Sequence, residues 1–192
     1  MNERVASHGS RRGYTVVELM AALAIFAIGV TGVAAMQKVT STSNAHAKNL
    51  AIATHLAESW LDRLTTDATN WGTAAGSTKT IWLTSPSGQW IVGPTNTDQN
   101  WGAGFDALGN YPAASAEDVA FCSHIRLTRV LQSVGTELIR TEVRVFWPRE
   151  GGGFTGTQLC ADANTQPAAI EADPAKFHFV YKSSAVRQAS NY

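Results

Sequence analysis

The first third of the chain holds one long apolar run. It covers residues 14–36 and reads YTVVELMAALAIFAIGVTGVAAM, with Glu18 as its one charged residue. A helix of this length crosses a hydrocarbon layer of about 30 Å, because each helical residue rises about 1.5 Å. The pattern therefore predicts a single membrane-spanning helix.

Beyond this run the helical pattern continues, but it becomes amphipathic. Apolar residues recur at intervals of three and four and form one stripe, which consists of Met36, Val39, Ala47, Leu50, Ala53, Ala57, Leu61 and Leu64. Charged residues lie mostly off the stripe, so one face is expected to pack. We expect the helix to continue over residues 37–66 and to dock on a head formed by residues 67–192. A short coiled coil is the alternative.

The second half of the chain shows alternation typical of strands. In residues 136–147, one set of side chains is expected to face the core and the next set to face solvent: Ile139, Val143, Val145 and Trp147 against Arg140, Glu142, Arg144 and Phe146. A similar inward set precedes it, namely Phe121, Ile125, Leu127 and Leu131, with residues 132–135 as the turn. A last strand is predicted over residues 176–182.

The region between the helix and these strands is rich in Thr, Ser, Gly and Asn. Its short apolar runs at residues 80–83 and 89–93 predict a hairpin around residues 85–88, within a variable loop region. The whole pattern indicates an α+β fold, in which a long N-terminal helix packs on an antiparallel sheet.

Composition narrows the functional classes. The chain has 192 residues, 44% of them apolar, and 15 basic residues balance 15 acidic ones. A neutral chain has no overall field to attract nucleic acid or anionic lipid, so no nucleic-acid partner is predicted. A mean hydropathy of −0.09 excludes a protein with many membrane spans but allows one.

The residues before the apolar run set its orientation. Arg4, Arg11 and Arg12 outweigh Glu3, which keeps this end in the cytoplasm and places the rest outside it. An ordinary signal peptide cleaved before Met36 is one alternative explanation. It does not account for Glu18, whose carboxylate is costly in an apolar segment unless a partner neutralises it.

The segment Gly13, Tyr14, Thr15, Val16, Val17, Glu18, Leu19 resembles the processing site of the type IV pilin family. The resemblance implies that prepilin peptidase cuts after Gly13 and that Tyr14 becomes the N-methylated first residue of the mature chain. The family usually has Phe at this position, so Tyr14 is a departure. Residues 22–37 look most like a PilV-type minor pilin and, secondly, like the I-type minor pseudopilin of type II secretion.

The resemblance also implies partners and a location. Glu18 would pair with the Tyr14 amine of a neighbouring subunit and set the register of a helical bundle, since paired charges are tolerated where single ones are not. A competing interpretation is that Thr15 and Glu18 only cap the helix. The expected partners are other major and minor pilins, prepilin peptidase and the inner-membrane assembly platform. The protein would span the inner membrane once, with its head in the periplasm, before entering a pilus fibre at the cell surface.

Small residues and cysteines complete the structural expectations. Gly29 and Gly32 would allow close helix packing, although glycine is also simply common in membrane helices. Cys122 and Cys160, both outside the cytoplasm, favour a disulfide, worth about 4 kcal/mol in the chain-entropy model. Pilins often close their C-terminal region in this way. Two buried free thiols are the alternative.

The search for catalytic, cofactor or metal motifs found none. The five histidines lack metal-ligand spacing, and the oxygens of residues 96–100 lack the pattern of a calcium loop, so a solvated turn is expected there. The six tryptophans are scattered, which favours packing over glycan binding. We therefore expect no enzyme but a minor type IV pilin that primes assembly and supports adhesion or motility. The alternatives are an I-type pseudopilin and an anchored or secreted periplasmic enzyme or binding protein.

Overall fold

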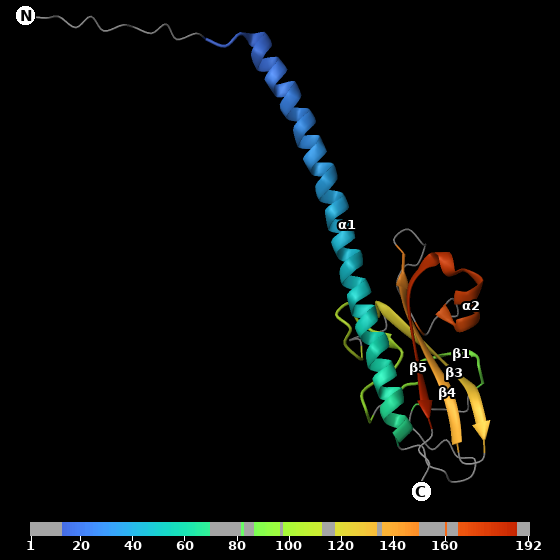
Figure 1. The fold of residues 1–192 in the computed structure, drawn as a ribbon. Helices are drawn as coiled ribbons and strands as arrows, with labels where there is room; N and C mark the ends of the chain where they lie inside the picture. The colour runs from blue at the N-terminus through green and yellow to red at the C-terminus, as the bar shows by residue number, and fades with distance from the viewer. Residues whose placement is uncertain are drawn as a thin grey trace, which may run out of the picture. The chain divides into compact units, whose positions relative to one another are not determined.

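The fold was analysed in a computed structural model. It describes residues 13–69, 82, 87–96, 98–112, 118–133, 136–149, 160 and 165–187. The chain divides into two compact units, residues 1–46 and 47–192. Helix α1, Val16–Thr69, contributes to both units, and the remaining elements belong to the second (Figure 1). Helix α1 ends at Thr69, slightly beyond the predicted end at residue 66.

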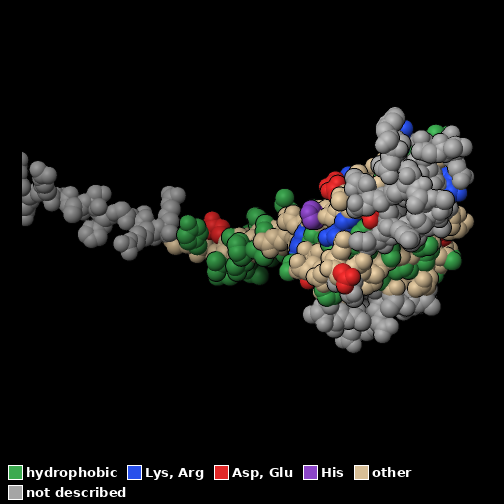
Figure 2. Space-filling view, turned by 90° about the horizontal axis from the view of Figure 1, so that it is seen from below, with side chains coloured by type: hydrophobic (Ala, Val, Ile, Leu, Met, Phe, Trp, Pro, Cys, Tyr) green, Lys and Arg blue, Asp and Glu red, His purple; other side chains and the backbone are tan. Residues whose placement is uncertain are grey.

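Every residue of α1 within the first unit, 16–46, is exposed. It is apolar enough to span a membrane, and the most apolar window has no buried residue. Figure 2 shows apolar side chains along this part of the helix. Polar side chains within it are satisfied locally, because the Thr31 hydroxyl donates to the Ile28 carbonyl at 2.8 Å and that of Thr40 to Met36 at 2.9 Å. This segment is thus suited to an apolar environment that the chain alone does not supply.

The second unit contains an antiparallel sheet. Its strands are β1 (Trp90–Val92), β2 (Gly104–Phe105), β3 (Phe121–Ser133), β4 (Thr136–Pro148) and β5 (Phe177–Arg187). They lie in the order β1-β3-β4-β5, and β2 also pairs with β3. Helix α2, Pro167–Ala172, and a 3-10 turn, Pro174–Lys176, precede β5. The α+β architecture is as predicted.

The main core lies between α1 and one face of the sheet. Ala53, Leu56, Ala57, Trp60, Leu64 and Ala68 supply the buried stripe of α1, and Ile125, Ile139, Val143, Val145 and Trp147 are among the sheet residues in the same cluster. The inward set predicted for β4 is therefore confirmed. The predicted helix stripe is correct from Ala53 onward, whereas Leu50 is 43% exposed. The stripe of the sequence pattern omitted Leu56, Trp60 and Ala68, which are buried.

The opposite face of the sheet is partly covered too, which corrects the expectation of a solvated face. Phe146 packs with Cys122, Phe177 and Ile170 of α2 in a second buried cluster. Arg144 is also buried. The sequence pattern missed this layer because α2 is too short to show helical periodicity.

Two further strand predictions are modified. Leu131 was expected to face the core but is 52% exposed, because the pairing of β3 with β4 shifts register between Arg129 and Leu131. Such a bulge changes which face the following residues occupy. The last strand runs on to Arg187, beyond the predicted residues 176–182. Residues 80, 81 and 83–86 of the predicted hairpin lie outside the described residues. Trp90–Val92 is a strand, as expected.

Candidate processing and assembly site

The predicted processing site lies where α1 begins. Gly13, Tyr14 and Thr15 precede the helix, and Val16 is its first residue. Tyr14 is 91% exposed, and no other group lies within 4 Å of the space that a Cβ on Gly13 would occupy. The Gly13–Tyr14 bond therefore sits in accessible, non-helical backbone, the form in which a peptidase can bind it.

Thr15 and Glu18 form a reciprocal cap at this helix end. The Thr15 backbone N–H donates to Glu18 Oε2 at 2.9 Å, and the Thr15 hydroxyl donates to the same oxygen at 3.0 Å. In return, the Glu18 N–H donates to Thr15 Oγ1 at 3.2 Å. Helix starts leave backbone donors without intrahelical partners, and this arrangement satisfies two of them. The capping interpretation is thus correct as a description of the isolated chain.

The cap does not use the whole carboxylate. Both bonds from Thr15 go to Oε2, and Oε1 accepts no hydrogen bond from any residue that the structure describes. One oxygen therefore stays available for a cation from another molecule. Capping and pairing with a neighbouring amine are compatible roles for Glu18.

The surface next to this cap is apolar and uncovered. Val17, Leu19, Phe26 and Ile28 are between 58% and 75% exposed. A Cβ added at Gly29 or at Gly32 would meet nothing within 4 Å, so both glycines leave open space on the helix. In water such a surface is unfavourable by about 25 cal/mol for each Å². The helix consequently requires lipid or other helices around it.

Comparison with known families identifies the same segment. Residues 9–34 match the family described as the prokaryotic N-terminal methylation motif. The chain carries the prepilin motif of the type IV pilin family. The motif implies processing by prepilin peptidase and assembly into pilus-like complexes. No curated protein and no solved structure matches the chain.

The prepilin motif supports a type IV pilin or pseudopilin-like protein. They fit a pilin anchored in the membrane by a single span. The long helix on an antiparallel sheet is the fold expected of such proteins. The position of the cut and the methylated residue are still predictions, which concern Gly13 and Tyr14.

The disulfide in the head is present. Cys122 on β3 is bonded to Cys160, with Cα atoms 5.5 Å apart. The bond lies at the part of the sheet that α2 covers, because Cys122 and Cys160 both pack in the cluster that contains Ile170. The interpretation as two free thiols is therefore wrong, and the predicted disulfide is confirmed.

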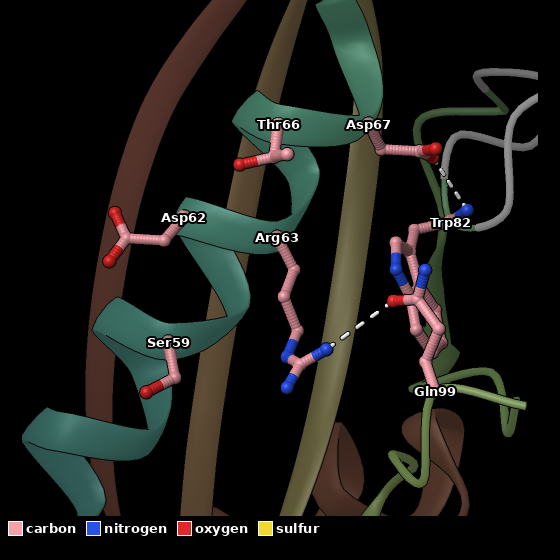
Figure 3. Close-up of a pocket in the computed structure, with 7 residues that line it drawn as sticks. All are labelled: Ser59, Asp62, Arg63, Thr66, Asp67, Trp82 and Gln99. Carbon is pink, nitrogen blue, oxygen red and sulfur yellow. Dashed lines mark hydrogen bonds between the residues drawn. The ribbon is translucent and has the colours of Figure 1, made fainter. Parts of the chain in front are cut away.

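A groove lies beside the last turns of α1. It has a volume of about 380 Å³ and is lined by Ser59, Asp62, Arg63, Thr66, Asp67, Trp82 and Gln99. Figure 3 shows that Arg63 and Asp67 point toward Gln99 and Trp82, whereas Asp62 and Thr66 point away from them. Asp67 accepts a hydrogen bond from the Trp82 N–H at 2.7 Å, and Arg63 lies over the Trp101 ring at 4.0 Å. These contacts attach the following loop to the helix.

Several of the remaining residues that the sequence singled out have structural contacts, whereas Trp71 and Thr97 lie outside the described residues. Asn96 Oδ1 accepts a hydrogen bond from the Gln99 N–H at 2.9 Å, as in a turn. Trp60 lies edge to face with Trp82 and Trp101, at ring distances of 5.3 and 6.0 Å, so these scattered tryptophans meet in one cluster. Among the described residues, no group of three or more His, Cys, Asp or Glu is placed to hold a metal ion.

One buried polar pair was not foreseen from the sequence. His124 on β3 faces Arg144 on β4, and the Arg144 Nε donates to His124 Nδ1 at 3.1 Å. Burial, with a smaller effect of the Arg144 cation, lowers the pKa of His124 to about 3. The imidazole is consequently neutral at physiological pH. Strand alternation placed Arg144 on the outer face, but only the tertiary structure shows that this part of the face is covered.

Proposed function

We propose that this protein is a minor pilin of a type IV pilus, that it primes pilus assembly at the tip, and that it supports adhesion or motility without catalysing a reaction. The observation that carries the proposal is the cap at Thr15 and Glu18, directly after Gly13 and Tyr14 and directly before an uncovered apolar helix. A secreted enzyme or binding protein has no need for an acidic residue at this place.

The proposed mechanism follows from the charges at the helix start. Cleavage after Gly13 creates a cationic amine on Tyr14 at the edge of the apolar layer. The free Oε1 of Glu18 in one subunit accepts a hydrogen bond from the Tyr14 amine of the next. This pairing offsets the cost of holding each charge in an apolar bundle. It selects the axial position of each subunit as its helix leaves the membrane for the fibre.

The second candidate is an I-type minor pseudopilin of type II secretion, which uses the same helix in a periplasmic pseudopilus. The size of the head favours the pilin. The second unit extends from Ala47 to Tyr192 and carries a disulfide. A head of this size is large for the I type. Both candidates are structural subunits whose partners bind through their N-terminal helices.

Mass spectrometry of the purified protein tests the class. Both pilin proposals require a mature chain that begins at N-methylated Tyr14. A chain that begins at Met36 would instead indicate ordinary secretion, and a chain that keeps residues 1–13 in fibres would overturn the mechanism.

A second experiment separates the two candidates. Deletion of the gene is followed by separate assays of surface pili and of exoprotein secretion. Loss of pili with normal secretion supports the minor pilin, and the reverse supports the pseudopilin. Labelling of the head in isolated fibres then tests the tip position, since label along the whole shaft would contradict it.

A further inference from the structure

The sheet face opposite α1 remains open beyond the part that α2 covers. Antiparallel register places the open side chains in adjoining rows, since Trp90 is opposite Arg126, Arg126 is opposite Glu142, and Glu142 is opposite Ser183. We name this surface the outer patch; it consists of Trp90, Arg126, Thr128, Arg140, Glu142, Tyr181, Ser183 and Arg187. It lies wholly within the second unit and has no part in the processing site.

The outer patch is cationic on a chain whose net charge is zero. It holds three arginines and one carboxylate, and this carboxylate is already saturated. Glu142 accepts two hydrogen bonds from Arg126, at Oε2 from Nε at 2.8 Å and at Oε1 from a terminal guanidinium nitrogen at 2.9 Å. Its Oε2 also forms an ion pair with Arg140 Nε at 3.2 Å. These bonds lower the pKa of Glu142, so it stays ionised. The patch therefore retains positive charge.

Some hydrogen-bond donors of the patch face solvent. The Arg140 side chain is 52% exposed, and only its Nε is bonded among the described residues, which leaves both terminal nitrogens to solvent. Arg187 is exposed at the end of β5, opposite Leu138, and Ser183 is exposed between it and Tyr181. A surface with free guanidinium donors is complementary to carboxylates.

The Trp90 ring of the patch supports two of the arginines, whereas Tyr181 is 58% exposed. The guanidinium carbons of Arg126 and Arg144 lie over the Trp90 ring, at 4.6 and 4.4 Å from its centre. Tyr181 stacks on Phe179 at 5.7 Å and places its ring 6.2 Å from that of Trp90. Nucleobases and sugars are usually bound on an exposed aromatic face. The Trp90 ring is engaged by two guanidinium groups and is not available to either ligand.

Two arginines at the patch, Arg126 and Arg144, are held in place before any partner binds. Arg144 beneath it is held by His124 and donates to the Pro167 carbonyl at 3.3 Å. Arg126 is fixed by two bonds to Glu142. Side chains that are already ordered lose little entropy on association, and Trp, Tyr and Arg are the residues that carry most binding energy in protein interfaces. A rigid set of these residues on an open sheet face has the composition of an interface centre.

We propose that the outer patch docks an acidic segment of a partner protein, whose carboxylates accept hydrogen bonds from Arg140, Arg126 and Arg187. The partner is recognised by its acidic side chains, and the Trp90 ring fixes Arg126 in position. The proposal does not depend on the pilin function, because it concerns the face of the head that is remote from α1.

The test uses the full chain in micelles of an uncharged detergent, with poly-L-glutamate as the probe. The wild type is compared with Arg140→Glu and with Lys176→Glu. Lys176 is a matched control, because its side chain is also 52% exposed and also makes one ion pair, with Asp173. We expect Arg140→Glu to weaken poly-L-glutamate binding at least tenfold and Lys176→Glu to change it less than twofold. Thermal unfolding of each variant checks the fold, and Arg187→Glu replaces Arg140→Glu if that variant does not fold.

Three results would overturn the proposal. The first is no binding of poly-L-glutamate to the wild type at moderate salt. The second is an equal loss of poly-L-glutamate binding with Arg140→Glu and Lys176→Glu, which would mean nonspecific electrostatic attraction. The third is that heparin or a single-stranded oligonucleotide binds more tightly than poly-L-glutamate and shows the same loss with Arg140→Glu, which would make the patch a site for another class of polyanion.

Discussion

The two parts of α1 have the same secondary structure and opposite relations to their surroundings. In the first part, Ile25 and Phe26 are 72% and 68% exposed; in the second, Leu56 and Trp60 are 1% and 0% exposed. Both parts carry large apolar residues. The difference is that the second part has a sheet of the same chain to pack on. An apolar helix face in this protein therefore indicates a partner, which is internal for one part and external for the other.

Trp60→Ala and Phe26→Ala test this comparison most directly. Trp60 packs with two other tryptophans, so its loss is expected to lower the free energy of unfolding of the head by about 3–5 kcal/mol. Phe26→Ala should change it by less than about 0.5 kcal/mol, because its side chain is 68% exposed. Tryptophan fluorescence during denaturant unfolding of the full chain in detergent measures both, since every tryptophan lies in the second unit. Equal changes in the free energy of unfolding for the two variants would contradict the difference between the two parts of α1.

Substitution of Glu18 separates assembly from folding. Glu18→Ala removes both the cap and the charge, whereas Glu18→Gln keeps an acceptor for Thr15 and removes only the charge. If pairing with the neighbouring amine matters, both variants are poorly incorporated into fibres, with a cost of about 3–5 kcal/mol for an unpaired partner. The measurement is the recovery of each variant in sheared fibres, with unfolding of the head as the control. Normal recovery of Glu18→Gln would show that the charge is not needed.

The buried His124 makes the stability of the second unit depend on pH. Its folded pKa of about 3 lies below the ordinary value of 6.5, so below pH 6.5 the unfolded chain binds a proton that the folded chain does not. Stability should therefore fall as the pH drops from 6.5 toward 3, by about 2 kcal/mol at pH 5 relative to pH 7.5. Denaturant unfolding at the two pH values measures this change. His124→Gln should flatten it, and an unchanged slope would exclude this histidine as the cause.

Thr15→Ala is expected to have the smallest effect. It removes the cap at one helix end, worth about 1 kcal/mol, and leaves the charge of Glu18 in place. Hydrogen exchange at the amides of Glu18 and Leu19 in micelles should become faster by about fivefold, while exchange in β3 and β4 stays the same. Faster exchange in the sheet would show that the two parts of α1 are coupled.

Local patterns predicted much of this molecule. The apolar run, the prepilin motif, the inward residues of β4 and the disulfide between Cys122 and Cys160 all depend on short-range spacing or on cellular location. The failures share one cause. A bulge exposes Leu131, and the short helix α2 covers the face that carries Phe146 and Arg144. Alternation along a single strand contains no information about a bulge or about a helix distant in sequence.

The sequence by itself determined where the chain enters an apolar environment, where the helix begins, and which acidic residue lies at that point. It did so because these features depend on neighbouring residues along one helix. Only the tertiary structure decided that His124 and Arg144 meet in a buried pair and that four strands bring arginines and aromatic rings together on an open face. Such contacts join residues many positions apart, and their energies depend on burial and register, which exist only once the sheet has formed.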